Sequence, residues 1–311
     1  MKILKSEERK SKRRLLQWAG TIVTLSALIF LISQQGWGEI ASAVSQISVW
    51  HLGSAVVLML CSRLAVAMRW YILVKAIEPQ VSFKNLAQVT FAGLFASNFL
   101  PSTIGGDVVR LVGVMQYSIS SAGGAASLLI DRLVGILSML IMIPFAGKVT
   151  IKEIFGQTVY GPVLVYGLLG NFKLKEIFGR FYKWIIDTLK TCSLWYEHPL
   201  SISGAFFFNA LHMISLFGTL GVIVSGLGDY LPLWKLGALW SIVYFITLVP
   251  ISINGYGLQE ISVAFVLTHW GNMSSSHSIT VALMIRMMFV LLSLPGAAFL
   301  PKLISRLDKR R

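Results

Sequence analysis

Charged residues are scarce in this chain, and acidic residues are the scarcest. Only 13% of its 311 residues are charged, whereas 55% are hydrophobic. A soluble domain typically carries about 25% charged residues. Asp and Glu number 13 together, against 27 Lys and Arg. This balance excludes a water-soluble domain, and we predict an all-α polytopic membrane protein.

Cysteine is almost absent as well. Cys61 lies within an apolar run and Cys192 within a basic segment, so the sequence offers neither a disulfide framework nor a cysteine metal site. It also contains neither a P-loop nor an Asp-based phosphorylation motif. We therefore expect no metal, no cofactor and no direct use of ATP.

The positive charge is concentrated in three blocks that flank apolar runs. Seven Lys and Arg lie in residues 1–14, five in 173–190 and five in 302–311. Such a bias marks cytoplasmic segments, so we expect both termini of a plasma-membrane protein to be cytoplasmic. Anionic lipids at the cytoplasmic face, and not nucleic acid, are the expected partners of these blocks. The sequence carries no signal of oligomeric state.

Apolar runs of roughly 20 residues, the length of a transmembrane helix, predict six crossings. They lie near residues 15–33, 51–77, 121–146, 155–171, 200–226 and 278–300. The basic residues before the first run resemble the start of a signal peptide. Because that run is longer than a usual signal-peptide core, we interpret it as an uncleaved span.

Two further apolar stretches, 84–118 and 233–270, are too long for one span and are broken by Pro, Gly and Asn. The breaks read NFLPSTIGGDVVR at 98–110 and LVPISINGYGLQE at 248–260. Broken backbone is tolerated at membrane depth only where protein or a wet cavity surrounds it. We therefore predict two re-entrant helical hairpins whose tips reach into a polar transport site.

The order of elements recurs in the second half of the chain with the opposite direction. Segments 127–140 and 282–295 resemble each other, with Arg132 opposite Arg286. We predict an inverted-topology repeat. The expected regions are a basic N-terminus (1–14), a first span with an outer loop (15–50), a first repeat (51–147), a connecting span with a basic amphipathic segment (148–199), a second repeat (200–301) and a basic tail (302–311).

Ionisable residues at membrane depth cost roughly 2.5–3.5 kcal/mol each on insertion scales, and they usually serve a function. The broken stretches and their neighbouring spans hold five arginines and three carboxylates. This surplus of cations predicts a site for an anion. Arginine suits phosphate because its planar guanidinium binds two oxygens at once.

The predicted substrate-binding residues gather around the two tips and the adjacent spans. Amides and His212 are expected to hydrogen-bond sugar or amine groups of a lipid headgroup, and four glycines to shape the tips. No catalytic residue is predicted. The set comprises Arg69, Asn98, Pro101, Asp107, Arg110, Asp131, Arg132, His212, Asn254, Gln259, Glu260 and Arg286, with Gly105, Gly106, Gly255 and Gly257 at the tips.

Structural roles stay open for several of these residues. Arg63 and Arg110 are alternatively long side chains that reach toward an interface, and Arg69 is alternatively an interfacial anchor. For Asp131 we favour a carboxylate at a helix start. For His212 we favour a hydrogen-bonded packing residue.

Three segments together carry a family resemblance: NFLPSTIGGDVVR, LLIDRL and NGYGLQE. The chain resembles the lysylphosphatidylglycerol synthase transmembrane-region family from about residue 15 to 300. The resemblance implies a flippase-like membrane domain that moves lipids with modified headgroups between leaflets. Asp107 stands where glutamate is more often expected. The residues carried over by motif are Asn98, Pro101, Gly106, Arg110, Asp131, Arg132, Gly255 and Glu260.

The larger members of that family carry a soluble C-terminal domain that transfers an aminoacyl group to lipid. This chain ends ten residues after Pro301 in a basic tail. We therefore expect no synthase activity from this polypeptide, and no enzymatic activity in general.

The leading functional hypothesis is a translocator of an anionic or headgroup-modified phospholipid or glycolipid. An arginine-rich intramembrane cavity would hold the headgroup. One alternative is a membrane-embedded transferase that acts on a polyprenyl-phosphate-linked substrate, with Asp107 or Glu260 as base. Another is a non-transporting partner of a lipid-modifying enzyme.

Overall fold

The computed structural model describes residues 37–98, 100, 105–117, 119, 121–146, 195, 197–249 and 252–300, with isolated positions 26, 29 and 33. Every regular element in this described part is a helix. The predicted spans near 15–33 and 155–171, the basic segments and Pro101 lie outside the described residues, apart from the isolated positions.

Four helices of the described part are long and apolar enough to cross a bilayer. The longest has 29 residues, or about 43 Å, which exceeds the roughly 30 Å hydrocarbon core. These helices match four of the six predicted crossings. They are α3 (Val49–Ile77), α6 (Ser121–Met142), α10 (Pro199–Gly226) and α13 (Ser275–Ser293).

The helix starts follow local capping chemistry. Ser48 accepts a hydrogen bond from the backbone N–H of His51 at the start of α3, and Ser274 accepts from His277 at the start of α13. Both contacts satisfy a backbone donor that has no partner within the helix. A short helix, α2 (Trp37–Gln46), precedes α3.

The first broken stretch forms two helices, α4 (Phe83–Ser97) and α5 (Gly105–Met115). At about 22 and 16 Å they are too short to cross the hydrocarbon core. They pack closely and antiparallel, since a Cβ at Gly93 would lie 2.8 Å from the carbonyl oxygen of Gly106. A Cβ at Gly106 would lie 2.6 Å from the carbonyl oxygen of Gly93. Only glycine fits this contact.

The second broken stretch has the same plan. Helix α11 (Leu233–Thr247) is followed by the short 3-10 turn η3 (Ile253–Gly255) and helix α12 (Leu258–His269). At the turn Asn254, Gly255 and Gly257 have φ angles of 49°, 71° and 77°. Glycine adopts these left-handed angles without strain, which accounts for the two glycines.

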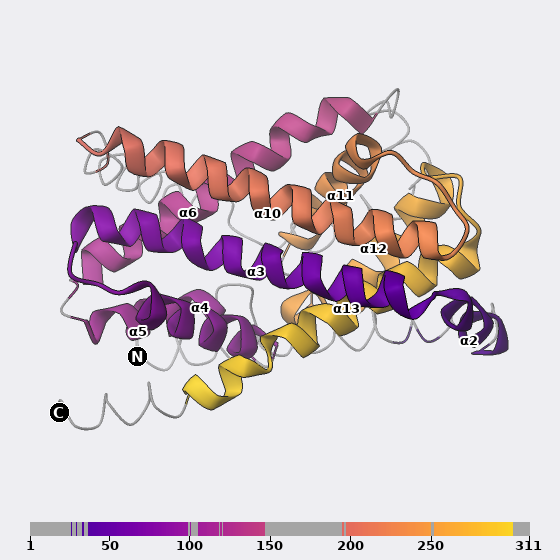
Figure 1. Ribbon diagram of the computed structural model, residues 1–311, viewed down its shortest axis with the longest axis horizontal. Coiled ribbons are helices and arrows are strands. Elements are labelled where there is room, and N and C mark those ends of the chain that lie inside the picture. The colour runs from indigo at the N-terminus through magenta and orange to yellow at the C-terminus, as the bar shows by residue number, and fades with distance from the viewer. Residues whose placement is uncertain are drawn as a thin grey trace, which may run out of the picture.

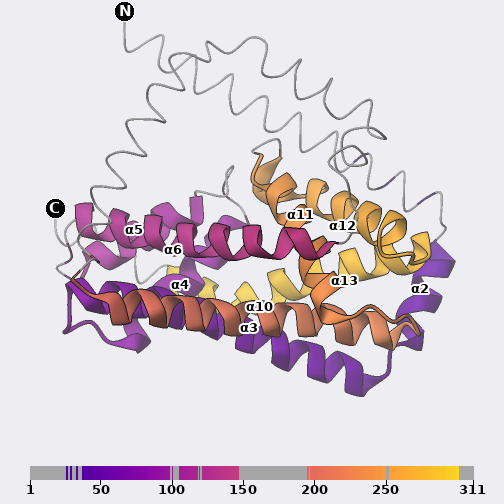
Figure 2. The ribbon, with the colours of Figure 1, turned by 90° about the horizontal axis from the view of Figure 1, so that it is seen from above.

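Helices α3 and α10 lie side by side and antiparallel along the length of the molecule (Figures 1 and 2). Gly204, near the start of α10, faces Ile72 near the end of α3. Gly226, at the end of α10, faces His51 near the start of α3. In both views the α4–α5 pair and the α11–α12 pair lie at opposite ends of the long axis.

Each short-helix pair has its own cluster of buried apolar side chains. The larger cluster joins α10 to α13 and includes Leu220, Leu239 and Ile285. The smaller one includes Trp70 and Leu86 and surrounds α4. The two halves also touch directly, because the helical turn after α13 packs Gly296 against the backbone of Phe91 in α4. Close backbone approach at small residues is characteristic of helix contacts in membranes.

Candidate functional site

Asp131 lies at the centre of a buried group of charges. It is 2% exposed, and it accepts a hydrogen bond from Arg69 Nε at 2.6 Å and another from Arg110 Nη2 at 3.1 Å. The helix-start interpretation favoured for Asp131 is wrong, because α6 begins ten residues earlier at Ser121. Asp131 is instead the counter-charge of two arginines from other helices.

Asp107 extends this group through both of its carboxylate oxygens. Its Oδ1 accepts from Arg110 Nη1 at 3.2 Å, and its Oδ2 accepts from Arg132 Nε. Arg69, Asp131, Arg110, Asp107 and Arg132 therefore form a continuous chain of ion pairs, here called the first ion-pair cluster. Among the described residues, this cluster contains three arginines and two carboxylates.

The alternative roles considered for Arg69 and Arg110 are also wrong. Arg110 is 8% exposed, and its guanidinium lies 4.2 Å from the ring centroid of Trp70, so it does not reach toward an interface. Arg69 is equally buried and donates from Nη1 to Asn209 of α10. Asn209 was not among the residues predicted from the sequence, although an amide within a long apolar helix is a usable signal.

The second ion pair joins α12 to α13. Arg286 donates from Nε to Glu260 Oε1 and from Nη2 to the carbonyl oxygen of Gly255 at 3.2 Å. Its Nη1 lies 3.5 Å from the carbonyl oxygen of Asn254, and its guanidinium covers the ring of Tyr256. Arg286 thus holds the second tip against the last long helix.

The two ion pairs closest to the tips occupy matching positions. Asp107 and Glu260 are each the third residue of their helices, which begin at Gly105 and Leu258. Arg132 and Arg286 are each the twelfth residue of α6 and α13, which begin at Ser121 and Ser275. Each arginine therefore binds the carboxylate of its own half in the same register.

The two tips meet. Asn254 Nδ2 donates to Asn98 Oδ1 at 3.3 Å, although 156 positions separate these residues. Asn98 Nδ2 in turn donates to Ser293 Oγ of α13 at 2.8 Å. Both tip asparagines selected from the sequence are thus in contact, whereas Ser293 was not selected. The tips touch directly in this structure, and a wet chamber between them stays a prediction.

Arg63 is the cation that the predicted site omitted. It lies in the middle of α3, and its guanidinium stands 4.3 Å from the ring centroid of Phe289 in α13. Within the part of the chain that the structure describes, no carboxylate lies within 4.0 Å of its nitrogens. The ring offers a cation–π contact but no counter-charge.

His212 connects the two central helices. Its Nδ1 shares a 2.8 Å hydrogen bond with Ser62 Oγ, which joins α10 to α3 beside Arg63. This geometry agrees with the packing role favoured for His212. Gln259, in the first turn of α12, is half-buried, and its side chain makes no hydrogen bond with the described residues.

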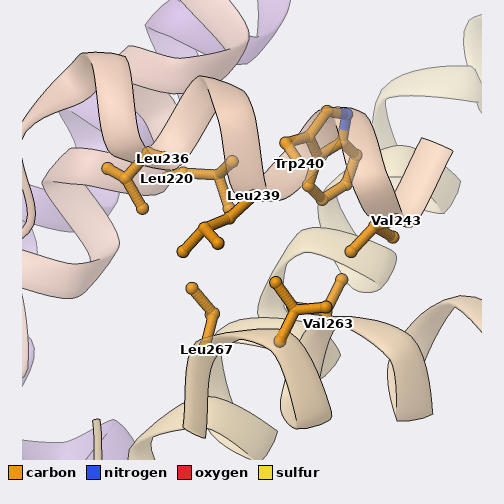
Figure 3. Close-up of a pocket in the computed structure, with 8 residues that line it drawn as sticks. Leu220, Leu236, Leu239, Trp240, Val243, Val263 and Leu267 are labelled. Carbon is orange, nitrogen blue, oxygen red and sulfur yellow. The ribbon is translucent and has the colours of Figure 1, made fainter. Parts of the chain in front are cut away.

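A small hollow between α10, α11 and α12 is apolar and separate from these charges (Figure 3). A predicted arginine-lined cavity is therefore not this hollow. Groups of His, Cys, Asp and Glu able to hold a metal ion are absent from the described residues. The lining residues are Leu220, Leu236, Leu239, Trp240, Val243, Val263, Val266 and Leu267.

Comparison with known families matches residues 17–296 to the lysylphosphatidylglycerol synthase TM region. No individual curated protein matches the chain. The matched range contains both tips, the first ion-pair cluster and the second ion pair. The all-helical fold, with four helices able to span a membrane, agrees with this match. The chain therefore belongs to the lysylphosphatidylglycerol synthase transmembrane-region family, a family of multi-pass membrane domains linked to lipid handling.

Proposed function

We propose that this protein moves an anionic or headgroup-modified phospholipid or glycolipid between the leaflets of the plasma membrane, with both termini in the cytoplasm. One observation carries the proposal. Among the described residues, arginines outnumber carboxylates on the helices that carry the two tips and on the long apolar helices beside them, and the two broken-helix tips are in contact. Uncompensated arginine inside a bilayer is costly and usually marks a substrate path.

We also propose that the two halves form an inverted repeat that gives the lipid access to each leaflet in turn. Three observations support it. The central helices α3 and α10 are antiparallel, the short-helix pairs lie at opposite ends of the molecule, and the ion pairs Asp107–Arg132 and Glu260–Arg286 share one register. Repeats of this kind usually place their substrate site at the interface between them.

Three arginines are suited to hold the headgroup. Arg63 has no carboxylate partner in the described part, Arg286 shares one carboxylate oxygen, and the Arg132 side chain is 34% exposed. Arg69 and Arg110 are fixed by Asp131 and serve to hold the helices together. A phosphate bound by Arg63, Arg132 and Arg286 would accept charge-assisted hydrogen bonds, while the acyl chains remain in lipid.

The hydrogen bonds between the two tips are the contacts that would open to let the lipid headgroup pass. Asn98 bonds to Asn254 and to Ser293 through neutral hydrogen bonds, each of which contributes about 0.5–1.5 kcal/mol net. Breaking them costs far less than breaking the buried ion pairs of Asp131. We therefore expect the tips to separate during transport while the first ion-pair cluster stays intact.

Purified protein in liposomes tests the function. Fluorescent phosphatidylglycerol is placed in both leaflets, and the fraction accessible to an impermeant quencher is followed over time. The proposal requires faster exchange than in protein-free vesicles, with the lipid recovered chemically unchanged. Covalent conversion of the lipid would favour a membrane-embedded transferase. Neither movement nor conversion would favour a non-transporting partner.

The variant pair Arg63→Ala and Arg63→Lys tests the headgroup assignment. Loss of a charged hydrogen bond, about 1.5–3 kcal/mol, should weaken headgroup affinity about tenfold or more. Lysine should restore part of it because it keeps the charge but loses the bidentate fork. Unchanged lipid movement in the alanine variant would remove Arg63 from the site.

A further inference from the structure

We propose that Glu260 binds a proton whenever an anionic headgroup binds at Arg286, so that lipid and proton move together. This inference rests on the proposed function, and it names the ion that is coupled to it.

The two oxygens of the Glu260 carboxylate differ in their surroundings. Oε1 accepts from Arg286 Nε. Oε2 is buried and has no hydrogen-bond partner in the described part of the chain. A buried oxygen without a partner loses its hydration and gains nothing in exchange. A proton on Oε2 would neutralise the carboxylate without displacing a hydrogen bond at this oxygen.

The matching carboxylate in the first half shows the contrast. Asp107 occupies the same helix position, but Oδ1 accepts from Arg110 and Oδ2 from Arg132. Both oxygens of Asp107 are therefore paired with an arginine. The two halves thus carry one carboxylate with both oxygens paired and one carboxylate with a single oxygen paired.

In the described part of the chain, the two helices packed against α12 carry no carboxylate. Helix α13 contributes Arg286, and the tip contributes Tyr256, whose ring lies under that guanidinium. Helix α11, which also packs on α12, carries Lys235 at its start and Tyr244, which interacts electrostatically with Arg132 and Asp131. One turn further along α13, Phe289 supports Arg63.

Competition for Arg286 provides the coupling. An ionised Glu260 neutralises this arginine and repels an incoming phosphate. A proton on Glu260 removes both effects, so the phosphate takes over the guanidinium as the carboxyl group becomes neutral. When the headgroup leaves, the proton leaves and the Glu260–Arg286 pair forms again. One monoanionic headgroup with one proton carries no net charge across the membrane.

The coupling between headgroup binding and proton uptake determines how headgroup affinity changes with pH. Because binding takes up one proton, headgroup affinity should rise as pH falls, by up to roughly tenfold per pH unit. The probe is a short-chain phosphatidylglycerol, whose phosphodiester does not titrate between about pH 5 and 8. Calorimetry in two buffers with different ionisation enthalpies counts the protons taken up by the full-length protein in detergent.

The expected results separate the variants. The unmodified protein should take up about one proton per bound anion. Glu260→Gln should bind without proton uptake and without pH dependence, whereas Glu260→Asp should keep both. Asp229→Asn is the matched control, because Asp229 pairs with His277 at the far end of α13. That variant should behave as the unmodified protein does. A melting curve establishes that each variant is folded.

Two outcomes overturn the proposal: proton uptake that persists in Glu260→Gln, or binding by the unmodified protein that releases or ignores protons. The result is distinguishable from a failure of the proposed function. Proton-linked binding that depends on Glu260 without any lipid movement in liposomes would retain the proton site and reject the translocator. Lipid movement with binding that is independent of pH would retain the translocator and reject the proton site.

Discussion

At the scale of single residues, the intramembrane arginines fall into two classes. Arg69 and Arg110 are bound to Asp131 in a buried network, whereas Arg63 rests on an aromatic ring. Burial of a paired charge holds helices in register, and burial of an unpaired one is a cost that function must explain. The two classes should respond differently to substitution.

Asp131→Asn should be strongly destabilising. The change leaves Arg69 and Arg110 buried without their shared counter-charge, which costs about 3–5 kcal/mol in comparable buried pairs. Thermal unfolding in detergent measures the loss. Asp229→Asn, at a partly exposed ion pair, should lower stability by less than about 1 kcal/mol. Equal losses in the two variants would contradict the central role of Asp131.

The sequence identified most of these residues but not their partners. Asn98, Asn254 and Glu260 were selected because each lies at or after a break in an apolar stretch, and Arg286 because it is a charge within an apolar span. Both are local signals. The role of Asp131 was misjudged because its partners Arg69 and Arg110 lie on other helices, and a local pattern does not report such contacts. Asn209 and Ser293 were missed because their partners lie 140 and 195 positions away.

At the scale of elements, glycine decides how closely α4 and α5 approach. Gly106→Val should force the two helices apart, because even a Cβ would lie 2.6 Å from the carbonyl oxygen of Gly93. Overpacking of this kind costs about 1–3 kcal/mol. It should also move Asp107, the next residue, away from Arg132.

The control for that change is Gly53→Ala in α3, where an added Cβ meets nothing within 4 Å. Alanine there should be neutral or slightly stabilising, because it favours the helix. Thermal unfolding and lipid movement are compared for both variants. A Gly106→Val protein as stable as Gly53→Ala would show that the hairpin tolerates a wider spacing.

Also at this scale, the tip contact makes a test of gating possible. Asn98→Cys and Asn254→Cys, in a background without Cys61 and Cys192, place two thiols where the amides now meet. A short reducible cross-linker between them should stop lipid movement, and reductant should restore it. Full activity of the cross-linked protein would show that the tips need not separate.

At the scale of the whole molecule, the inverted arrangement predicts which loops face which side. The first hairpin should begin at the cytoplasmic face near Gln80, and the second at the outer face near Tyr230, both of which are exposed. A cysteine at position 230 should react with an impermeant reagent added outside intact cells. One at position 80 should react only after permeabilisation. Labelling of both from one side would reject the inverted repeat.

The positions of the long helices in the described part could be predicted from the sequence, whereas the packing of these helices could not. Length and hydropathy predicted four long spans and two broken stretches, because these properties are set along the chain. Whether the tips touch or enclose water depends on side-chain fit between halves that are far apart in sequence. The direct Asn98–Asn254 contact is of that kind, and no local pattern reports it.

The packing of Gly296 on the backbone of Phe91 makes the two halves mechanically dependent on each other. Arg286 lies ten residues earlier in the same candidate span, Ser275–Leu300, about 15 Å away along the helix axis. A tilt of α4 would therefore displace the end of this span at Gly296, and with it the guanidinium of Arg286. Opening at one membrane face would thus be transmitted to the arginine of the opposite half without any third element in between.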